Sequence, residues 1–394
     1  MMPEKTHDLD EVARSGPAIK PLAASVGTRL AVVSGPTINL TREYPLDAQS
    51  TPPLRDAWYY ALPSERLKVG EMVPKTLLGE PVVIGRDKEG QVFALVDICP
   101  HRGIPLRFGK FDGCEIECCY HGWRFAPSGA CTDIPTLIDE QKPELAKVKV
   151  RSYPVQEVQG GIWIFFGDKP EFAPPVPVLP ELEGQTPKMI VTMMFDGSID
   201  HSVVGLVDPA HATFIHKAWF WRSPKSIRNK AKQFAPSPFG FTMVRHPPSA
   251  NSRAYKLLNF LLGKPEGTEI VFQLPGVRYE HIKVGGRVMC HLTTLTPISD
   301  FETEINHSIF WNARVLTWLR PLFWPFARTF LKQDRDVISQ QQEGLKYNPQ
   351  LLLLGDPDVQ ARWYFRLKNE YVRAQEENRP FENPIKPRVL QWRS

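Results

Sequence analysis

Two short segments combine cysteine and histidine at close spacing. The first reads Cys99-Pro-His101-Arg-Gly and the second reads Cys118-Cys-Tyr-His121-Gly-Trp, with sixteen residues between His101 and Cys118. Two thiolates and two imidazoles can bind a zinc ion or an iron–sulfur cluster. A single proline separates Cys99 from His101, which poorly suits two ligands of one tetrahedral ion. The spacing suits a wider object, so we expect each segment to give one ligand to each iron of a [2Fe–2S] cluster.

The remaining cysteines leave alternatives open. A structural zinc site or ordinary buried side chains could use the same residue types, although Gly103 and Gly122 beside the ligands favour a cluster because they let backbone N–H groups approach sulfur. Cys119 is adjacent to Cys118 and is the alternative ligand. Cys114 and Cys131 fit no ligand spacing, so we expect small core residues there.

A second group of possible ligands lies at Asp208-Pro-Ala-His211-Ala-Thr-Phe-Ile-His216. Asp208 and His211 are three residues apart and share a face if the segment is helical. His211 and His216 are five apart, about 140° out of phase on a regular α-helix. Both can reach one metal only if the helix bulges or ends between them. The alternative is a pair of ordinary histidines.

The order of segment types predicts two structured domains behind a leader. Residues 1–53 show no strong periodicity. Residues 54–168 contain short β-branched and aromatic runs bounded by Gly, Pro and Asp, which predicts a small all-β domain. After a Pro-rich stretch, residues 169–394 mix strand-like runs with helical runs such as Leu331–Leu345, so this domain is expected to be α+β.

The composition of the chain limits which partners it can bind and in which compartment we expect it. The chain of 394 residues carries a net charge of +5 without a basic run, so we expect no nucleic-acid binding. Clustered cysteines interleaved with histidine indicate a reducing compartment, and the N-terminus lacks a signal peptide, so we expect a cytoplasmic protein. We expect no transmembrane helix.

Residues 309–332 are rich in aromatic, leucine and cationic residues and broken by Pro321 and Pro325. They predict either a peripheral membrane contact or a buried helix pair.

These motifs resemble those of one known family. The strings CPHRG and CxYHGW resemble the two cluster loops of Rieske-type non-haem iron oxygenases, and D-x2-H-x4-H resembles the iron-binding motif of their catalytic domains. The form DPAHxxFxH is similar to the pheophorbide and chlorophyllide oxygenase branch. The resemblance implies an α+β fold: an N-terminal all-β Rieske [2Fe–2S] domain, then a helix-grip-like catalytic domain with an antiparallel sheet.

The same resemblance implies roles for individual residues. His211 and His216 would bind a mononuclear Fe(II) together with a distant carboxylate. The segment after Lys332 is similar to the family's third-ligand region and aligns Asp334 with the ligand, with Asp336 as the second choice. Asp208 would connect His211 to the cluster ligand His121 of a neighbouring subunit, which implies a homotrimer.

The implied activity is O2-dependent oxygenation. Electrons would come from NAD(P)H through a ferredoxin and/or flavin reductase to the Rieske cluster and then to the iron, and a lipophilic polycyclic, sterol-like or aromatic substrate would be hydroxylated or demethylated. Two other functions stay open: an aromatic ring cis-dihydroxylating dioxygenase, and a Rieske electron-transfer protein without oxygenase activity.

Overall fold

The computed structural model describes residues 51–141, 144–169, 173–216, 227–247, 262–263 and 265–394. The predicted leader of residues 1–53 therefore lies outside the described residues, except for its last three. The named strands pair antiparallel throughout the described chain. The domain boundary near residue 168 stays a prediction.

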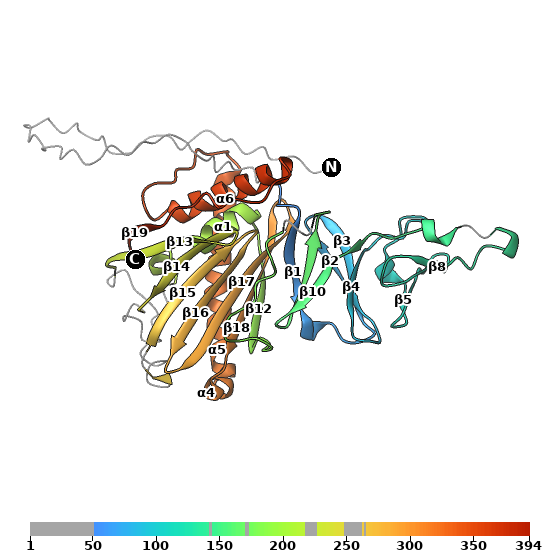
Figure 1. Cartoon of the computed structure of the whole chain (residues 1–394), viewed down its shortest axis with the longest axis horizontal. Helices are drawn as coiled ribbons and strands as arrows, with labels where there is room; N and C mark the ends of the chain where they lie inside the picture. The colour runs from blue at the N-terminus through green and yellow to red at the C-terminus, as the bar shows by residue number, and fades with distance from the viewer. Residues whose placement is uncertain (1–50, 142–143, 170–172, 217–226, 248–261, 264) are drawn as a thin grey trace, which may run out of the picture. The chain divides into compact units, whose positions relative to one another are not determined.

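Two small sheets form the first part of the described chain (Figure 1). Their inward-facing aromatic and β-branched residues pack together in one core that includes Tyr59, Ile84 and Phe166. The three-stranded sheet has the order β1-β11-β10, and the four-stranded sheet has the order β2-β3-β4-β9. The strands are β1 (Ala57–Pro63), β2 (Met72–Leu77), β3 (Glu80–Arg86), β4 (Val92–Val96), β9 (Ser152–Tyr153), β10 (Val155–Val158) and β11 (Gly161–Phe166).

A third small sheet carries the two Cys/His segments. Its strands are very short because turns interrupt them every few residues, and its core surrounds Leu106, Ile116 and Phe125. Its strands are β5 (Lys110–Phe111), β6 (Ile116–Glu117), β7 (Arg124–Phe125) and β8 (Cys131–Asp133). Short 3-10 turns lie at Ser64–Arg66, Leu106–Phe108, Asp139–Gln141 and Leu145–Lys147. The predicted all-β character of this part is confirmed.

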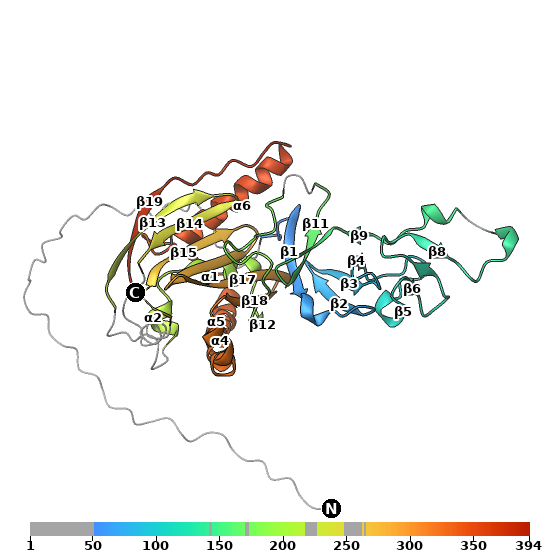
Figure 2. The same cartoon turned by 60° about the horizontal axis from the view of Figure 1, so that its bottom comes forward.

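An eight-stranded antiparallel sheet dominates the second part (Figure 2). Its order is β12-β18-β17-β16-β15-β14-β13-β19, so consecutive strands are mostly neighbours. The strands are β12 (Met189–Phe195), β13 (Asn229–Ser237), β14 (Gly240–His246), β15 (Pro265–Gln273), β16 (Val277–Val284), β17 (Arg287–Ser299), β18 (Glu302–Trp311) and β19 (Arg388–Arg393). The described helices are α1 (Ile199–Val207), α2 (Ala212–Ile215), α4 (Arg314–Trp318), α5 (Arg320–Leu345) and α6 (Val359–Glu376).

Helices α1, α5 and α6 cover one face of this sheet. Apolar side chains of all three, including Val203, Ile338 and Trp363, share one core with sheet residues such as Phe272 and Ile305. The opposite face packs against β1 and β11 and against residues 176–182. Helices on one face of an antiparallel sheet are the predicted α+β architecture, which is confirmed.

Helix α5 differs from the sequence expectation. The two prolines were expected to break the segment, but α5 continues through Pro325. Pro321 lies in the first turn, where its missing N–H is not needed. Pro325 is one turn further on and removes only one backbone hydrogen bond of a 26-residue helix. The continuous helix matters because it carries Asp334 toward the sheet.

Candidate metal centres

The two Cys/His segments form turns of the same kind. In each turn the cysteine N–H donates to the carbonyl of the residue five positions later, and the cysteine carbonyl accepts from the glycine four positions later. The four bonds are Cys99 N to Ile104 O at 2.8 Å, Gly103 N to Cys99 O at 2.9 Å, Cys118 N to Trp123 O at 2.8 Å and Gly122 N to Cys118 O at 3.0 Å. Both glycines adopt positive φ, +74° and +71°, which side chains disfavour. The two turns therefore have the same backbone hydrogen bonds, although His101 is two residues after its cysteine and His121 is three residues after its own.

The turns bring like side chains together. Cys99 and Cys118 are both buried, and their thiols interact, while burial raises the pKa of Cys99 to about 11. The rings of His101 and His121 lie with their centroids 4.5 Å apart. A Rieske cluster takes two cysteines on one iron and two histidines on the other. The paired arrangement fits this cluster better than one tetrahedral ion, which would draw all four groups to a single point.

Aromatic side chains cover the histidines. Trp123 stacks on His101 with a centroid distance of 4.5 Å and an interplanar angle of 5°, and Tyr120 lies 3.9 Å from His121. Cys119 is exposed, whereas Cys118 is buried, so the geometry favours Cys118 as the ligand.

The two cysteines outside the turns behave differently. Cys131 is buried in the core, as expected. Cys114 is exposed, so its prediction as a core residue was wrong. The reason is a local turn: Asp112 accepts a hydrogen bond from the N–H of Cys114 at 2.8 Å and holds this residue on the surface.

The second group of ligands lies where helix α1 ends. Val207 is the last helical residue, and Asp208 closes the following turn by accepting a hydrogen bond from Ala210 N at 2.7 Å. His211 and His216 then flank the four-residue helix α2. The helix was expected to bulge or end between the two histidines, and α2 ends at Ile215, where His216 leaves helical geometry (φ −84°, ψ 66°).

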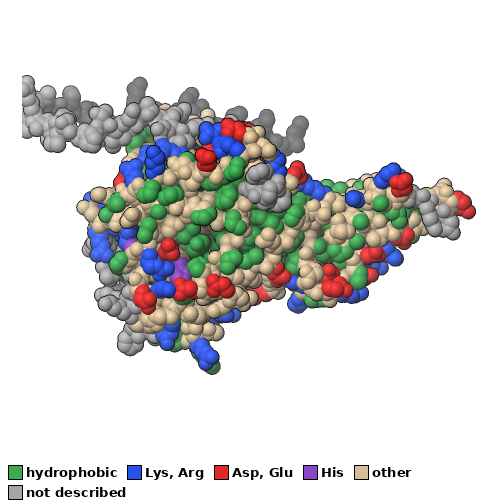
Figure 3. Space-filling model, in the orientation of Figure 1, with side chains coloured by type: hydrophobic (Ala, Val, Ile, Leu, Met, Phe, Trp, Pro, Cys, Tyr) green, Lys and Arg blue, Asp and Glu red, His purple; other side chains and the backbone are tan. Residues whose placement is uncertain are grey.

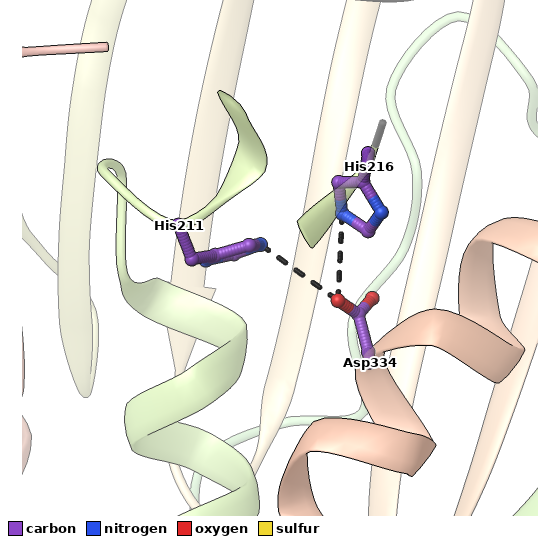
Figure 4. Close-up of side chains that lie close together, drawn as sticks. All are labelled: His211, His216 and Asp334. Carbon is purple, nitrogen blue, oxygen red and sulfur yellow. Dashed lines mark ion pairs between the residues drawn. The ribbon is translucent and has the colours of Figure 1, made fainter. Parts of the chain in front are cut away.

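Asp334 of α5 meets the two histidines (Figure 4). Its Oδ1 lies 3.4 Å from His216 Nε2 and 3.8 Å from His211 Nε2. Of the described residues, these three form the set that brings three potential ligand atoms within 4.8 Å of one another. Two imidazoles and one carboxylate that occupy one face of a metal ion form the facial triad of non-haem iron sites, which leaves other coordination positions open. The residues present therefore fit a mononuclear iron.

The Nδ1 atoms of the two histidines have polar partners on the side away from Asp334. Gln333 Oε1 lies 3.1 Å from His216 Nδ1, and Asp208 Oδ2 lies 3.5 Å from His211 Nδ1. Partners on Nδ1 leave Nε2 of each ring for the centre, which is how metal-bound histidines are usually oriented. Phe330 stacks on His216 with a centroid distance of 3.4 Å.

Burial and charge shift the protonation of the group. Burial raises the pKa of Asp334 to about 6, although His211 and Arg278 act in the opposite direction. For His211, burial favours the neutral ring, but the carboxylates of Asp208 and Asp334 outweigh it and raise the pKa. Asp334 and His211 therefore both hold a proton more readily than free side chains do, and a divalent cation at the centre would compete with these protons.

Asp336, the alternative third ligand, points elsewhere. Its carboxylate forms ion pairs of 2.6 Å with Lys332 and with Arg335 on the exposed side of α5. The structure thus brings Asp334, and not Asp336, to the histidines. Metal ligation by His211, His216 and Asp334 stays a prediction.

Comparisons with known proteins identify the first domain and the fold of the chain. Residues 57–154 match the Rieske [2Fe-2S] domain family. The solved structure of dicamba monooxygenase bound to dicamba superposes with a TM-score of 0.65 at 23% identity and covers 82% of this chain and 98% of its own. Residues 57–154 therefore belong to the Rieske [2Fe–2S] domain family, and the chain shares the fold of dicamba monooxygenase.

Two curated relatives give the extent of the likeness. Chlorophyllide a oxygenase of Chlamydomonas reinhardtii is 36% identical over 50% of this chain and 30% of its own length. Cholesterol 7-desaturase of Xenopus laevis is 28% identical over 83% of this chain and 75% of its own. The chain thus spans about a third of the length of the chlorophyllide a oxygenases it matches. In the described part of this Rieske protein, no helix is both long and apolar enough to cross a membrane.

Sequence reasoning did not identify Gln333 and Phe330 as parts of the second centre. A signal was present, because Phe330, Gln333 and Asp334 are spaced at i, i+3 and i+4 and must share one face of a helix. The signal was hidden because α5 was expected to begin at residue 331, so Phe330 was not assigned to it.

Proposed function

We propose that this chain is the oxygenase component of an O2-dependent Rieske system. In this proposal the [2Fe–2S] cluster binds to Cys99, His101, Cys118 and His121, and Fe(II) binds to His211, His216 and Asp334. A lipophilic polycyclic, sterol-like or aromatic substrate is hydroxylated or demethylated. The named activities of the chlorophyllide a oxygenase and cholesterol 7-desaturase relatives support a bulky lipophilic substrate.

The observation that carries the proposal is the triad of His211, His216 and Asp334 in the same chain as a Rieske domain. When bound, the cluster supplies single electrons and the mononuclear iron activates O2. The chain's own residues do the positioning. Gln333 and Asp208 orient the two rings, and Phe330 packs over His216 and excludes water from one side of it.

The metal content tests this proposal directly. Purified under anaerobic conditions, the protein should contain about three irons per chain, two in the cluster and one mononuclear. Asp334→Asn should lose the mononuclear iron and substrate-dependent O2 consumption while keeping the visible absorption of the cluster. Asp336→Asn on the same helix is the matched control and should keep all three irons. A wild-type protein with two irons would instead favour the electron-transfer protein, and a cis-diol product would favour the dioxygenase.

We also propose that the working unit is a homotrimer supplied by a ferredoxin and/or flavin reductase. Asp208 would connect His211 of one subunit to His121 of the next. Apolar side chains are exposed at both ends of this proposed contact: Ile98, Phe108 and Tyr120 near the cluster, and Phe214, Leu352 and Leu354 on the side of Asp208. Sedimentation of wild-type protein and of Tyr120→Ser at low concentration tests the contact. An active monomer would rule out this electron route.

The proposed setting is the cytoplasm, with peripheral contact to a membrane through α4 and the first turns of α5. All six cysteines are free, as a reducing compartment requires. Trp318 and Leu322 are 87% and 57% exposed, and residues 312–333 contain four cations and no acid. Lys and Arg side chains project at the tip where α4 lies (Figure 3). Exposed aromatics among cations suit an anionic lipid surface.

Vesicle sedimentation tests the membrane contact. The protein should sediment with vesicles that contain phosphatidylglycerol and less with vesicles of phosphatidylcholine alone. Trp318→Ser combined with Leu322→Ser should abolish binding. Phe301→Ser, which changes another exposed aromatic residue, is the control. If the double variant binds equally well, or if its only change is a smaller assembly, the face contacts protein and not lipid.

A further inference from the structure

Five polar residues lie side by side on the face of the large sheet that α1 and α5 cover. Across three strands, Arg278 of β16 is paired with Thr293 of β17, and Thr293 is paired with His307 of β18. One step along, Glu280 of β16 is paired with His291 of β17. Because residues at i and i+2 of a strand share a face, all five point to the same side. We refer to them as the polar floor.

Apolar residues surround the polar floor on the same face. On one side, Phe272, Leu295 and Ile305 pack with α1, α5 and α6. On the other, Ile282, Met289 and Ile309 pack with residues of α4 and α5. The floor is therefore a polar interruption in a layer that is otherwise covered by helices. Such an interruption costs stability unless its polar groups find partners.

The contacts within the floor leave much of its hydrogen-bonding capacity unused. Among the described residues, Arg278 forms one ion pair, with Glu280, and its length of 3.7 Å exceeds that of a hydrogen bond. A guanidinium has five N–H donors. Thr293 Oγ1 and His307 Nδ1 are 2.9 Å apart, and the rings of His291 and His307 are 5.4 Å apart without a hydrogen bond between them.

The floor keeps accessible surface although it lies within the layer. The side chains of Arg278 and Glu280 are 23% and 21% exposed, and His291 and His307 are half-buried. Burial nevertheless lowers the pKa of His307 to about 3 and also lowers that of His291. Side chains that are largely desolvated but still keep accessible surface usually line a concave part of the protein, and we infer that the polar floor does so. At neutral pH both rings are uncharged, so Arg278 is the cation of the floor.

The floor adjoins the proposed iron site. The positive charge of Arg278 acts on Asp334 and on His211, as well as on both floor histidines. A molecule whose reacting carbon lies at the triad would therefore have another part over the floor. Ligand sites usually combine an apolar lining with a few polar groups that fix orientation.

We propose that the polar floor binds an acceptor oxygen of the substrate, with the Arg278 guanidinium as the principal donor. This proposal rests on the proposed oxygenase function and deepens it: the substrate is amphipathic, with a lipophilic body and a carboxylate, carbonyl or hydroxyl oxygen. The neutral histidines and Thr293 donate to or accept from the same group. A partly buried Arg–Glu pair whose charged groups are 3.7 Å apart, without a hydrogen bond, contributes little to stability, so a role in binding accounts for it better than a role in folding.

Binding of three matched probes to the holoenzyme tests the proposal. Naphthalene has no acceptor oxygen, 1-naphthol has a neutral one and 1-naphthoate has an ionised one. Equilibrium dialysis should show at least one oxygenated probe binding about tenfold more tightly than naphthalene, which corresponds to about 1.4 kcal/mol. Arg278→Met should remove this preference. Lys283→Met, which removes a cation of the same strand that pairs with Glu181 on the opposite face, is the control and should keep it.

The outcomes separate the possibilities. Preference for naphthoate identifies a carboxylate, and equal preference for naphthol identifies a neutral oxygen. The proposal is overturned if naphthalene binds as well as the oxygenated probes, if none of the three binds, or if Arg278→Met keeps the preference. Should Arg278→Met fail to fold, Thr293→Val tests the same floor without removing a charge. Failure of the oxygenase function would appear in iron content and O2 consumption, which this binding assay does not use.

Discussion

The half-buried histidine His307 should make stability depend on pH in a way that one substitution removes. Burial, His291 and Arg278 lower its pKa from the ordinary 6.5 to about 3. In the unfolded chain the ordinary value returns. Between these two values the unfolded state binds a proton that the folded state does not, so the free energy of unfolding falls as the pH falls from 6.5 toward 3. Above pH 6.5 the ring is neutral in both states and the contribution is fully present.

The magnitude follows from the two pKa values. Integrating the proton difference from about pH 7.5 to about pH 5 gives a loss of about 2 kcal/mol for this one ring. The result changes little for any folded pKa below about 4. His307→Asn places an amide near the position of Nδ1, where it can keep the hydrogen bond to Thr293. The variant cannot titrate, so it should lose about 2 kcal/mol less than wild type over the same interval.

Urea unfolding at the two pH values, followed by tryptophan fluorescence, measures the difference. Contributions of distant groups that both proteins share cancel, including those of the metal centres. If wild type and His307→Asn lose the same free energy on acidification, His307 titrates normally and the polar floor is open to water. That result would contradict the burial on which the assignment of Arg278 as the floor's cation depends.

Two further predictions concern the buried Asp200, which connects α1 to α6, and the cysteine ligand of the cluster. Asp200 accepts hydrogen bonds from Tyr364 and Lys368, so Asp200→Asn should destabilise the fold by about 3 kcal/mol in thermal unfolding, whereas exposed Asp196→Asn should change it by under about 0.5 kcal/mol. Equal effects would show that the network is not stabilising. Cys118→Ser should abolish the visible absorption of the cluster and Cys119→Ser should keep it, and the reverse result would move the ligand to Cys119.

The cluster turns could be predicted from sequence because everything they need is local. Cysteine, histidine and turn glycine lie within five residues of one another, and the turn closes through its own backbone. What the sequence did not reveal is that both turns close identically although their histidines occupy different positions. That Cys99 lies beside Cys118 and His101 beside His121 could likewise be seen only in the folded structure.

The second centre could be predicted only in part from neighbouring residues in the sequence, because Asp334 is far along the chain from its two histidines. The spacing of His211 and His216 required a helix that ends between them, and α2 ends at Ile215, directly before His216. Asp334 and Asp336 differ by about 200° in helical phase, so the direction of α5 decides between them. That direction could not be read from sequence, because Pro321 and Pro325 were expected to break a segment in which α5 continues through Pro325.

The polar floor was the least predictable feature, and it changes the expectation for the substrate. Arg278, His291 and His307 are 13 and 16 residues apart in sequence and meet only through the register of three strands. The sequence assigned no role to these two histidines, and the family resemblance implied only that the substrate is lipophilic. Read across the sheet, they form a polar group beside the triad. The lining can then hold a lipophilic body in one orientation, and orientation is what selects one carbon for reaction.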